Sequence, residues 1–272
     1  MNTNPRAIAV PSLTALVAII TLAGCNLPVA TGPSPTPSLD TSTPLPALAS
    51  PTSLPPAPTP PAPTVSPTPS LLRISFPTGA TAGVEQGTLQ AGGIQAFVLA
   101  ASQTQPMIVM VDSPAHDLTA DIIGQNTGNT LLPASQKEST WEGILPATQD
   151  YLITVHGGAS EEAFTLTVDI PSRITFAPQA TSAKVSGSTP GGLVVSYVIY
   201  ALAGQTMAVS LTAPSGAAAL TIYGFEDGQP LLRSIYNATT WSDTLPVTED
   251  YIIQIVPNAG QVVAYTMTVG VQ

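Results

Sequence analysis

The side chains that could carry acid–base chemistry are few, and both histidines lie in the same stretch of the chain. The only histidines are His116 and His156. A hydrolytic triad would need one of them beside an activated serine and an oriented carboxylate. The sequence contains no Gly-x-Ser-x-Gly nucleophile elbow and no His-Glu-x-x-His zinc pair. We therefore predict that both histidines are exposed loop residues and that the protein is not an enzyme.

Metal binding has only weak candidates in the same stretch. Asp112, Asp117 and Asp121 follow one another closely, and the Glu161–Glu162 pair comes later in a glycine-rich segment. Carboxylate oxygens are the ligands that calcium prefers, but this spacing matches no calcium-loop template. The sequence predicts no cofactor, with calcium at the three aspartates as the remaining alternative.

The first 24 residues have the organisation of an export signal. A single basic residue, Arg6, precedes an apolar run over residues 13–23, which is short for a membrane span. The segment then ends with Leu22, Ala23, Gly24 and Cys25. This ending resembles the lipobox of bacterial lipoproteins, in which the cysteine is lipidated and becomes the first mature residue. The resemblance implies that Cys25, the only cysteine of the chain, anchors the protein to a membrane on its extracytoplasmic side.

Residues 25–70 have the composition of a linker. After Cys25 the segment consists mainly of proline, threonine, serine and alanine, with almost no charged or aromatic residues. Such a segment buries too little apolar surface to offset its chain entropy, and its prolines favour extended backbone. We predict a disordered linker that holds the rest of the chain away from the bilayer.

The remainder of the chain is an internal repeat. Arg73-Ile74-Ser75-Phe76 returns as Arg173-Ile174-Thr175-Phe176, and TWEGILPATQDYLITV from Thr140 returns as TWSDTLPVTEDYIIQI from Thr240. The repeat predicts two domains of one fold, over residues 71–170 and 171–272.

Each copy has the pattern of short strands. Apolar residues alternate with polar or small ones, as in Met207, Val209 and Leu211, and turn residues separate the runs. Seven or eight such runs in about 100 residues predict an all-β fold, with two tandem antiparallel β-sandwiches of jelly-roll or Greek-key type.

The order of motifs in each copy is similar to that of the bacterial pre-peptidase C-terminal domain. The features that carry the resemblance are a glycine-containing strand, a run such as YVIYALAGQTMAVSLTAP, a Leu-Pro-x-Thr-x-Asp-Tyr turn and a closing YTMTV strand. That family consists of jelly-roll accessory domains of secreted proteins, implicated in secretion, stability or polymer binding. No catalytic domain precedes the two copies here.

The repeated Trp…Pro…Asp-Tyr motif has a structural and a functional interpretation. A tyrosine at the start of a late strand can hydrogen-bond across a sandwich corner, with nearby Asp and Thr residues capping the turn locally. The functional alternative is that the tryptophans stack on sugar rings. We favour the structural corner, formed by Trp141, Pro146, Asp150 and Tyr151 and by Trp241, Pro246, Asp250 and Tyr251.

Charge excludes one class of partner. The chain has 16 acidic and 6 basic residues, a formal net charge of -10, and its basic residues are scattered, so we exclude nucleic acid binding. We expect a non-catalytic surface lipoprotein whose sandwiches serve extracellular binding, adhesion or envelope scaffolding, with a polymer or a protein as partner. The alternatives are a pair of carbohydrate-binding modules, which would expose coplanar aromatic rings on one sheet face, and a hydrolase accessory or inhibitor protein.

Overall fold

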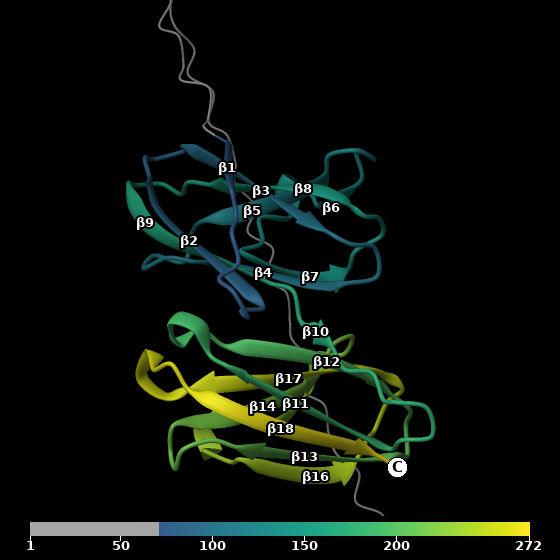
Figure 1. The fold of residues 1–272 in the computed structure, drawn as a ribbon. Coiled ribbons are helices and arrows are strands. Elements are labelled where there is room, and N and C mark those ends of the chain that lie inside the picture. The colour runs from purple at the N-terminus through teal and green to yellow at the C-terminus, as the bar shows by residue number, and fades with distance from the viewer. Residues whose placement is uncertain (1–70) are drawn as a thin grey trace, which may run out of the picture. The chain divides into compact units, whose positions relative to one another are not determined.

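The computed structural model describes residues 71–272 (Figure 1). The predicted signal peptide, the lipobox with Cys25 and the predicted linker lie outside these residues. Everything described below belongs to one compact unit of the chain. No helix among residues 71–272 is long and apolar enough to cross a membrane.

The first copy is a sandwich of nine strands and one short 3-10 helix. The elements are β1 (Leu71–Arg73), β2 (Ala82–Leu89), β3 (Ile94–Ala101), β4 (Pro106–Asp112), β5 (Thr119–Gly124), β6 (Thr130–Leu132), η1 (Ala134–Gln136), β7 (Thr140–Ile144), β8 (Gln149–His156) and β9 (Glu162–Asp169).

The strands of the first sandwich are wired as a jelly roll. One sheet has the order β1-β3-β8-β5-β6 and the other has the order β2-β9-β4-β7. Strands β2 to β5 therefore alternate between the two sheets, and β7 and β8 do so again, as in a double Greek key. All pairings are antiparallel except that of β1 with β3, which is parallel.

The second copy repeats this arrangement. Its elements are β10 (Ser172–Arg173), β11 (Ser182–Ser188), η2 (Pro190–Gly192), β12 (Val195–Ala201), β13 (Thr206–Thr212), β14 (Ala218–Gly224), β15 (Pro230–Leu232), η3 (Ser234–Tyr236), β16 (Thr240–Thr244), β17 (Glu249–Pro257), η4 (Asn258–Gly260) and β18 (Ala264–Val271). The sheets have the orders β10-β12-β17-β14-β15 and β11-β18-β13-β16. The predicted pair of β-sandwiches is confirmed.

Each sandwich has its own core. One cluster of buried apolar residues lies within residues 74–168 and a second within residues 174–271. The alternation in sequence accounts for both, because successive side chains of a strand point to opposite faces of a sheet. One pair of contacting aromatic residues differs in chemistry between the copies. The rings of Phe97 and Phe164 meet edge to face at 6.1 Å, whereas the corresponding Tyr197 and Tyr265 share a hydrogen bond of 2.8 Å between their hydroxyl oxygens.

A third, smaller cluster joins the two sandwiches. Val198, Phe225 and Ile252 of the second sandwich are buried, and Ile108 of the first packs against them. Beside this cluster the Ser196 hydroxyl donates a hydrogen bond to Asp169 Oδ2. The outer face of one sheet of the first sandwich is therefore partly covered by the second.

Candidate functional site

The repeated motif forms the same corner in both sandwiches. The Tyr151 hydroxyl donates to the Ala147 carbonyl at 2.6 Å, and the Tyr251 hydroxyl donates to the Val247 carbonyl at 2.6 Å. Both tyrosine side chains are buried, so the hydrogen bond satisfies a phenolic oxygen that has little access to water. This is the geometry of a tyrosine corner.

The other polar residues of the motif reach distant parts of the chain. The Thr148 hydroxyl oxygen accepts from the Gln103 backbone N–H at 2.9 Å, 45 residues away, and does not cap its own turn. The Asp150 carboxylate pairs with Arg73 of β1 at 2.8 Å, and the matching pair of Asp250 with Arg173 measures 2.7 Å. The motif therefore connects the corner to the turn after β3 and to the edge strand β1. The sequence predicts only hydrogen bonds within the corner's own turn.

The two tryptophans pack against the cores. Trp141 lies against the first core cluster and Trp241 against the second, and each is only partly exposed. A Cβ atom at Gly143 would come within 2.6 Å of the Trp141 ring, so this glycine leaves room for the indole. The strongly exposed aromatic side chains among the described residues are Tyr200 and Tyr236.

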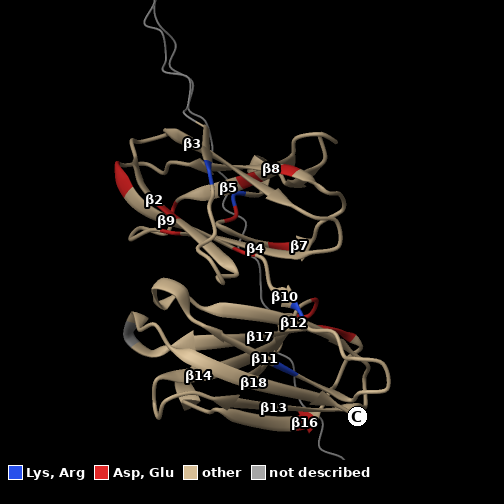
Figure 2. Ribbon diagram, viewed as in Figure 1, with Lys and Arg blue, Asp and Glu red and all other residues tan. Residues whose placement is uncertain are grey.

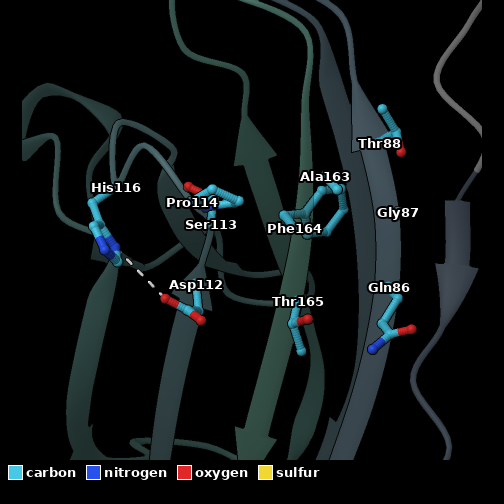
Figure 3. Close-up of a pocket in the computed structure, with 10 residues that line it drawn as sticks. All are labelled: Gln86, Gly87, Thr88, Asp112, Ser113, Pro114, His116, Ala163, Phe164 and Thr165. Carbon is cyan, nitrogen blue, oxygen red and sulfur yellow. Dashed lines mark ion pairs between the residues drawn. The ribbon is translucent and has the colours of Figure 1, made fainter.

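One histidine, one aspartate and one serine, His116, Asp112 and Ser113, line a hollow on the first sandwich (Figure 3). This first-sandwich hollow has a volume of about 670 Å³, and it lies over β2, β9 and the loop after β4. Its lining consists of Gln86, Gly87, Thr88, Asp112, Ser113, Pro114, His116, Ala163, Phe164 and Thr165.

Small residues and a rigid ring shape the floor of this hollow. Phe164 is buried, and a Cβ atom at Gly87 would come within 2.8 Å of its ring. Gly87 on β2 faces Phe164 in the antiparallel register with β9, and Thr88 faces Ala163. The floor is therefore fixed by the core, while Gln86, Thr88 and Thr165 supply hydrogen-bonding groups around it.

A histidine–aspartate pair stands at the rim. His116 Nδ1 lies 3.6 Å from Asp112 Oδ1, and the two side chains are 78% and 64% exposed. Ser113 is buried, and its backbone carbonyl, not its hydroxyl, accepts a hydrogen bond from the His116 backbone N–H. Within the described part of the chain, no serine hydroxyl is hydrogen-bonded to either histidine, so the hollow lacks the proton relay of a triad.

The second histidine is not an isolated loop residue. His156 Nε2 lies 2.6 Å from Asp121 Oδ2, and this partly buried pair links β8 to β5. The prediction of an exposed loop residue is therefore wrong for His156, because β8 continues as far as this position and places its ring against β5.

The three aspartates proposed as weak calcium candidates have separate partners. Asp112 pairs with His116 and Asp121 with His156, whereas Asp117 Oδ2 accepts from the Ala159 N–H at 3.0 Å. The Ala159 hydrogen bond, followed by the neighbouring Glu162 carboxyl group, lowers the pKa of Asp117. Over residues 71–272 no group of three or more His, Cys, Asp or Glu side chains could hold a metal ion.

Several residues of the hollow escape prediction from sequence. Gln86, Thr88 and Ala163 are ordinary strand residues with no motif around them, and only the pairing of β2 with β9 brings them together. The one available signal is the contrast between copies, because Asp112 and His116 correspond to Thr212 and Gly216 in the repeat.

Charged residues are sparse over both sandwiches and form no basic stripe in the described region (Figure 2). Acidic positions gather on the first sandwich, around β4, β7 and β9, and the four strands of the second sandwich's smaller sheet are almost free of charge (Figure 2).

Comparison with known proteins yields structural likenesses alone. A scan against protein-family models finds no match, and neither does a search of curated proteins. The crystal structure of PliG from Aeromonas hydrophila, a periplasmic lysozyme inhibitor of g-type lysozyme, is 26% identical, covering 38% of this chain and 96% of that one, with a TM-score of 0.34. PliG from Salmonella Typhimurium is 13% identical, with coverages of 38% and 99% and a TM-score of 0.31. The CUB1-EGF-CUB2 domains of rat MASP-1 are 8% identical, with coverages of 75% and 100% and a TM-score of 0.24.

Proposed function

We propose that this protein is a non-catalytic envelope lipoprotein that binds an extracellular partner through its sandwiches. Cys25 would hold the membrane, residues 26–70 would space the sandwiches from it, and each sandwich would be a domain of the pre-peptidase C-terminal type. The proposal needs no cofactor.

The observation that carries the proposal is the chemistry of the first-sandwich hollow. Its volume of about 670 Å³ falls in the range of ligand sites, and its lining combines a buried aromatic floor with a few polar groups. Asp112 and His116 at its rim are exposed and can contact a ligand, and among the described residues no serine hydroxyl is hydrogen-bonded to His116. Such a site supports recognition of a ligand.

Binding to isolated envelope material tests the proposal. The full-length protein, purified in detergent, is incubated with cell-wall fractions, soluble polysaccharides and envelope proteins, and the retained fraction is measured. Ala163→Trp fills the hollow from an exposed position of β9, whereas Glu138→Ala alters an exposed residue outside it. We expect Ala163→Trp to weaken retention roughly tenfold, since a filled pocket forfeits most of its contacts, and Glu138→Ala to leave it unchanged.

A separate arm tests the alternative of a hydrolase inhibitor. The g-type lysozyme that PliG inhibits is a defined probe, and its hydrolysis of peptidoglycan is followed with and without the protein. Stoichiometric inhibition would favour the inhibitor alternative. If the protein is retained on none of these materials and does not inhibit the lysozyme, extracellular binding is refuted.

A further inference from the structure

Two acidic side chains meet at the loop between β14 and β15 of the second sandwich. Glu249, the first residue of β17, is 1% exposed, and its Oε1 atom is buried with no hydrogen-bond partner among the described residues. Asp227 lies in the loop itself. A Cβ atom at Gly224 would collide with both Glu249 Oε1 and Asp227 Oδ1, so these two oxygens are close neighbours. The unpartnered oxygen of Glu249 therefore faces a second carboxylate.

Backbone N–H groups of the loop fix both carboxylates. Glu249 Oε2 accepts from the N–H of Glu226 at 2.7 Å and from that of Asp227 at 3.2 Å. Asp227 Oδ1 accepts from the N–H of Gln229 at 2.8 Å. Backbone N–H groups form charge-assisted hydrogen bonds with ionised carboxylates. These bonds orient the two groups toward one another and leave Glu249 Oε1 without a donor.

The first sandwich has the same loop with neutral side chains in both places. Gln149 stands at the position of Glu249, and Thr127 stands at the position of Asp227. Gln149 Oε1 accepts from the N–H groups of Asn126 and Thr127, at 3.0 Å each. The hydrogen bonds from the loop backbone are therefore the same in the two copies.

The copies differ in the contact between the two side chains. In the first sandwich Gln149 Nε2 donates to Thr127 Oγ1 at 3.1 Å. A Cβ atom at Gly124 would meet both of these atoms, just as one at the equivalent glycine would meet Glu249 Oε1 and Asp227 Oδ1. The first copy thus places a donor against an acceptor where the second copy places two acceptors. A positive partner between the two oxygens would restore the missing attraction.

No basic side chain of the described region supplies this partner. At this corner Arg173 pairs with Asp250 at 2.7 Å, and both guanidinium hydrogen bonds go to that carboxylate. Burial raises the pKa of Tyr251, and the negative charges of Glu249 and Asp227 raise it further. The two acids therefore add negative charge beside a buried phenol and have no cationic side chain bound to them.

The donor chemistry selects a hard cation. Calcium takes six to eight oxygen ligands in a flexible geometry and accepts backbone carbonyl groups and water beside carboxylates, whereas magnesium requires a near-ideal octahedron. Zinc and softer metals prefer histidine and cysteine, and the loop over residues 224–230 contains neither. Two carboxylates are fewer ligands than a metal centre built from side chains alone, so loop carbonyl groups and water would complete the shell of calcium.

We propose that Glu249 and Asp227 form a calcium site at the β14–β15 loop, with Glu249 Oε1 and Asp227 Oδ1 as the side-chain ligands. The ion connects this loop to the start of β17, as the hydrogen bond from Gln149 to Thr127 does in the first sandwich. The inference goes beyond the proposed function and does not rest on it, because the site lies in the other sandwich from the first-sandwich hollow. It is also distinct from the three aspartates that the sequence offers as calcium candidates, which all belong to the first copy.

Calcium binding to the full-length protein in detergent tests the inference. The protein is freed of divalent ions with EDTA and dialysed to equilibrium against labelled calcium chloride. We expect one ion per chain with a Kd of about 10⁻⁴ to 10⁻³ M, the range of extracellular calcium modules. Glu249→Gln installs the residue that the first sandwich has at this position, and we expect it to raise the Kd at least about tenfold by removing a charged ligand. Glu138→Gln, at an exposed acidic position of the first sandwich, is the control and should leave the Kd within about twofold of wild type.

A reciprocal variant transfers the site to the first sandwich. Thr127→Asp combined with Gln149→Glu gives the first copy the two acids of the second. We expect this double variant to bind a second calcium ion with a similar Kd. Circular dichroism verifies that each variant is folded before its binding is compared with that of wild type.

Three results would overturn the inference. The first is a wild-type protein that binds no calcium at about 10 mM, well above the expected Kd. The second is calcium binding that Glu249→Gln leaves unchanged, which would place the ion elsewhere. The third is a stability difference between wild type and Glu249→Gln that depends on pH and not on calcium, which would show that the two acids share a proton. None of these results bears on retention by envelope material, so the proposed function would stand.

Discussion

The Asp169 carboxyl group makes the stability of the tandem depend on pH. Its side chain is 7% exposed, Oδ2 accepts from Ser196, and Oδ1 is buried with no hydrogen-bond partner. Burial raises the pKa of Asp169 from 3.8 to about 6, against the hydrogen bonds from Ser196 and Thr81, which lower it. Burial raises the pKa of Tyr223, and the negative charges of Glu142 and Asp169 raise it further.

The sign of the effect follows from the direction of this pKa shift. Because the pKa of Asp169 is higher in the folded protein than in the unfolded chain, the folded protein binds more protons between pH of about 4 and about 6. The free energy of unfolding therefore falls as the pH rises through this window. A difference of roughly two pKa units corresponds to about 3 kcal/mol in the free energy of unfolding. This stabilisation is present below pH of about 4 and is lost above pH of about 6.

Urea unfolding of the full-length protein measures this effect, with tryptophan fluorescence and circular dichroism as probes. Asp169→Asn keeps the shape of the side chain and removes its titration. We expect the free energy of unfolding of wild type to fall by about 3 kcal/mol relative to that of the variant as the pH rises from about 4 to about 7. Asp243→Asn, at an exposed position of β16, is the control and should show no comparable change. A difference for Asp169→Asn that stays constant with pH would refute the burial of this carboxylate between the sandwiches.

Three further predictions concern the anchor, the corner and the core. Cys25→Ser should release the protein from membranes into the soluble fraction, and a variant that still sediments with membranes would contradict lipidation at this residue. Tyr251→Phe should lower the free energy of unfolding by about 1 kcal/mol through loss of the corner hydrogen bond, and urea denaturation at neutral pH would detect an effect of this size. Gly87→Val should lower it by about 1–3 kcal/mol, because even a Cβ there would meet the Phe164 ring at 2.8 Å. Gly270→Ala, whose Cβ would have 3.6 Å of clearance, should change it by less than about 0.5 kcal/mol, and equal losses in the two glycine variants would show that crowding at the ring is not the cause.

The fold was accessible from the sequence because its signals are local. Alternation along residues such as Met207, Val209 and Leu211 identifies a half-buried strand without knowledge of its neighbours, and the repeat divides the strands between two copies. The tyrosine corner is also local, since Tyr251 bonds a carbonyl four residues earlier. The partners of Thr148 and Asp150 were inaccessible, because they lie 45 and 77 residues away and are brought close only by sheet order.

The candidate sites show the same limit. The internal repeat predicts two domains with similar surfaces. The presence of Asp112 and His116 in the first copy alone indicates only that the surface of the first domain differs from that of the second. The hollow itself depends on β2, β9 and the end of β4 lying side by side in one sheet.

The sequence by itself determined the two β-sandwiches and their corner, since side-chain alternation and turn chemistry act over a few residues. Only the tertiary structure decided which face of each copy is covered. Ile108 and Asp169 form a contact where Ala208 and Gly270 form an open array, although these residues hold the same register positions. The physical reason is that burial of an outer sheet face depends on the docking of one domain against another, and no local pattern in either copy encodes that docking.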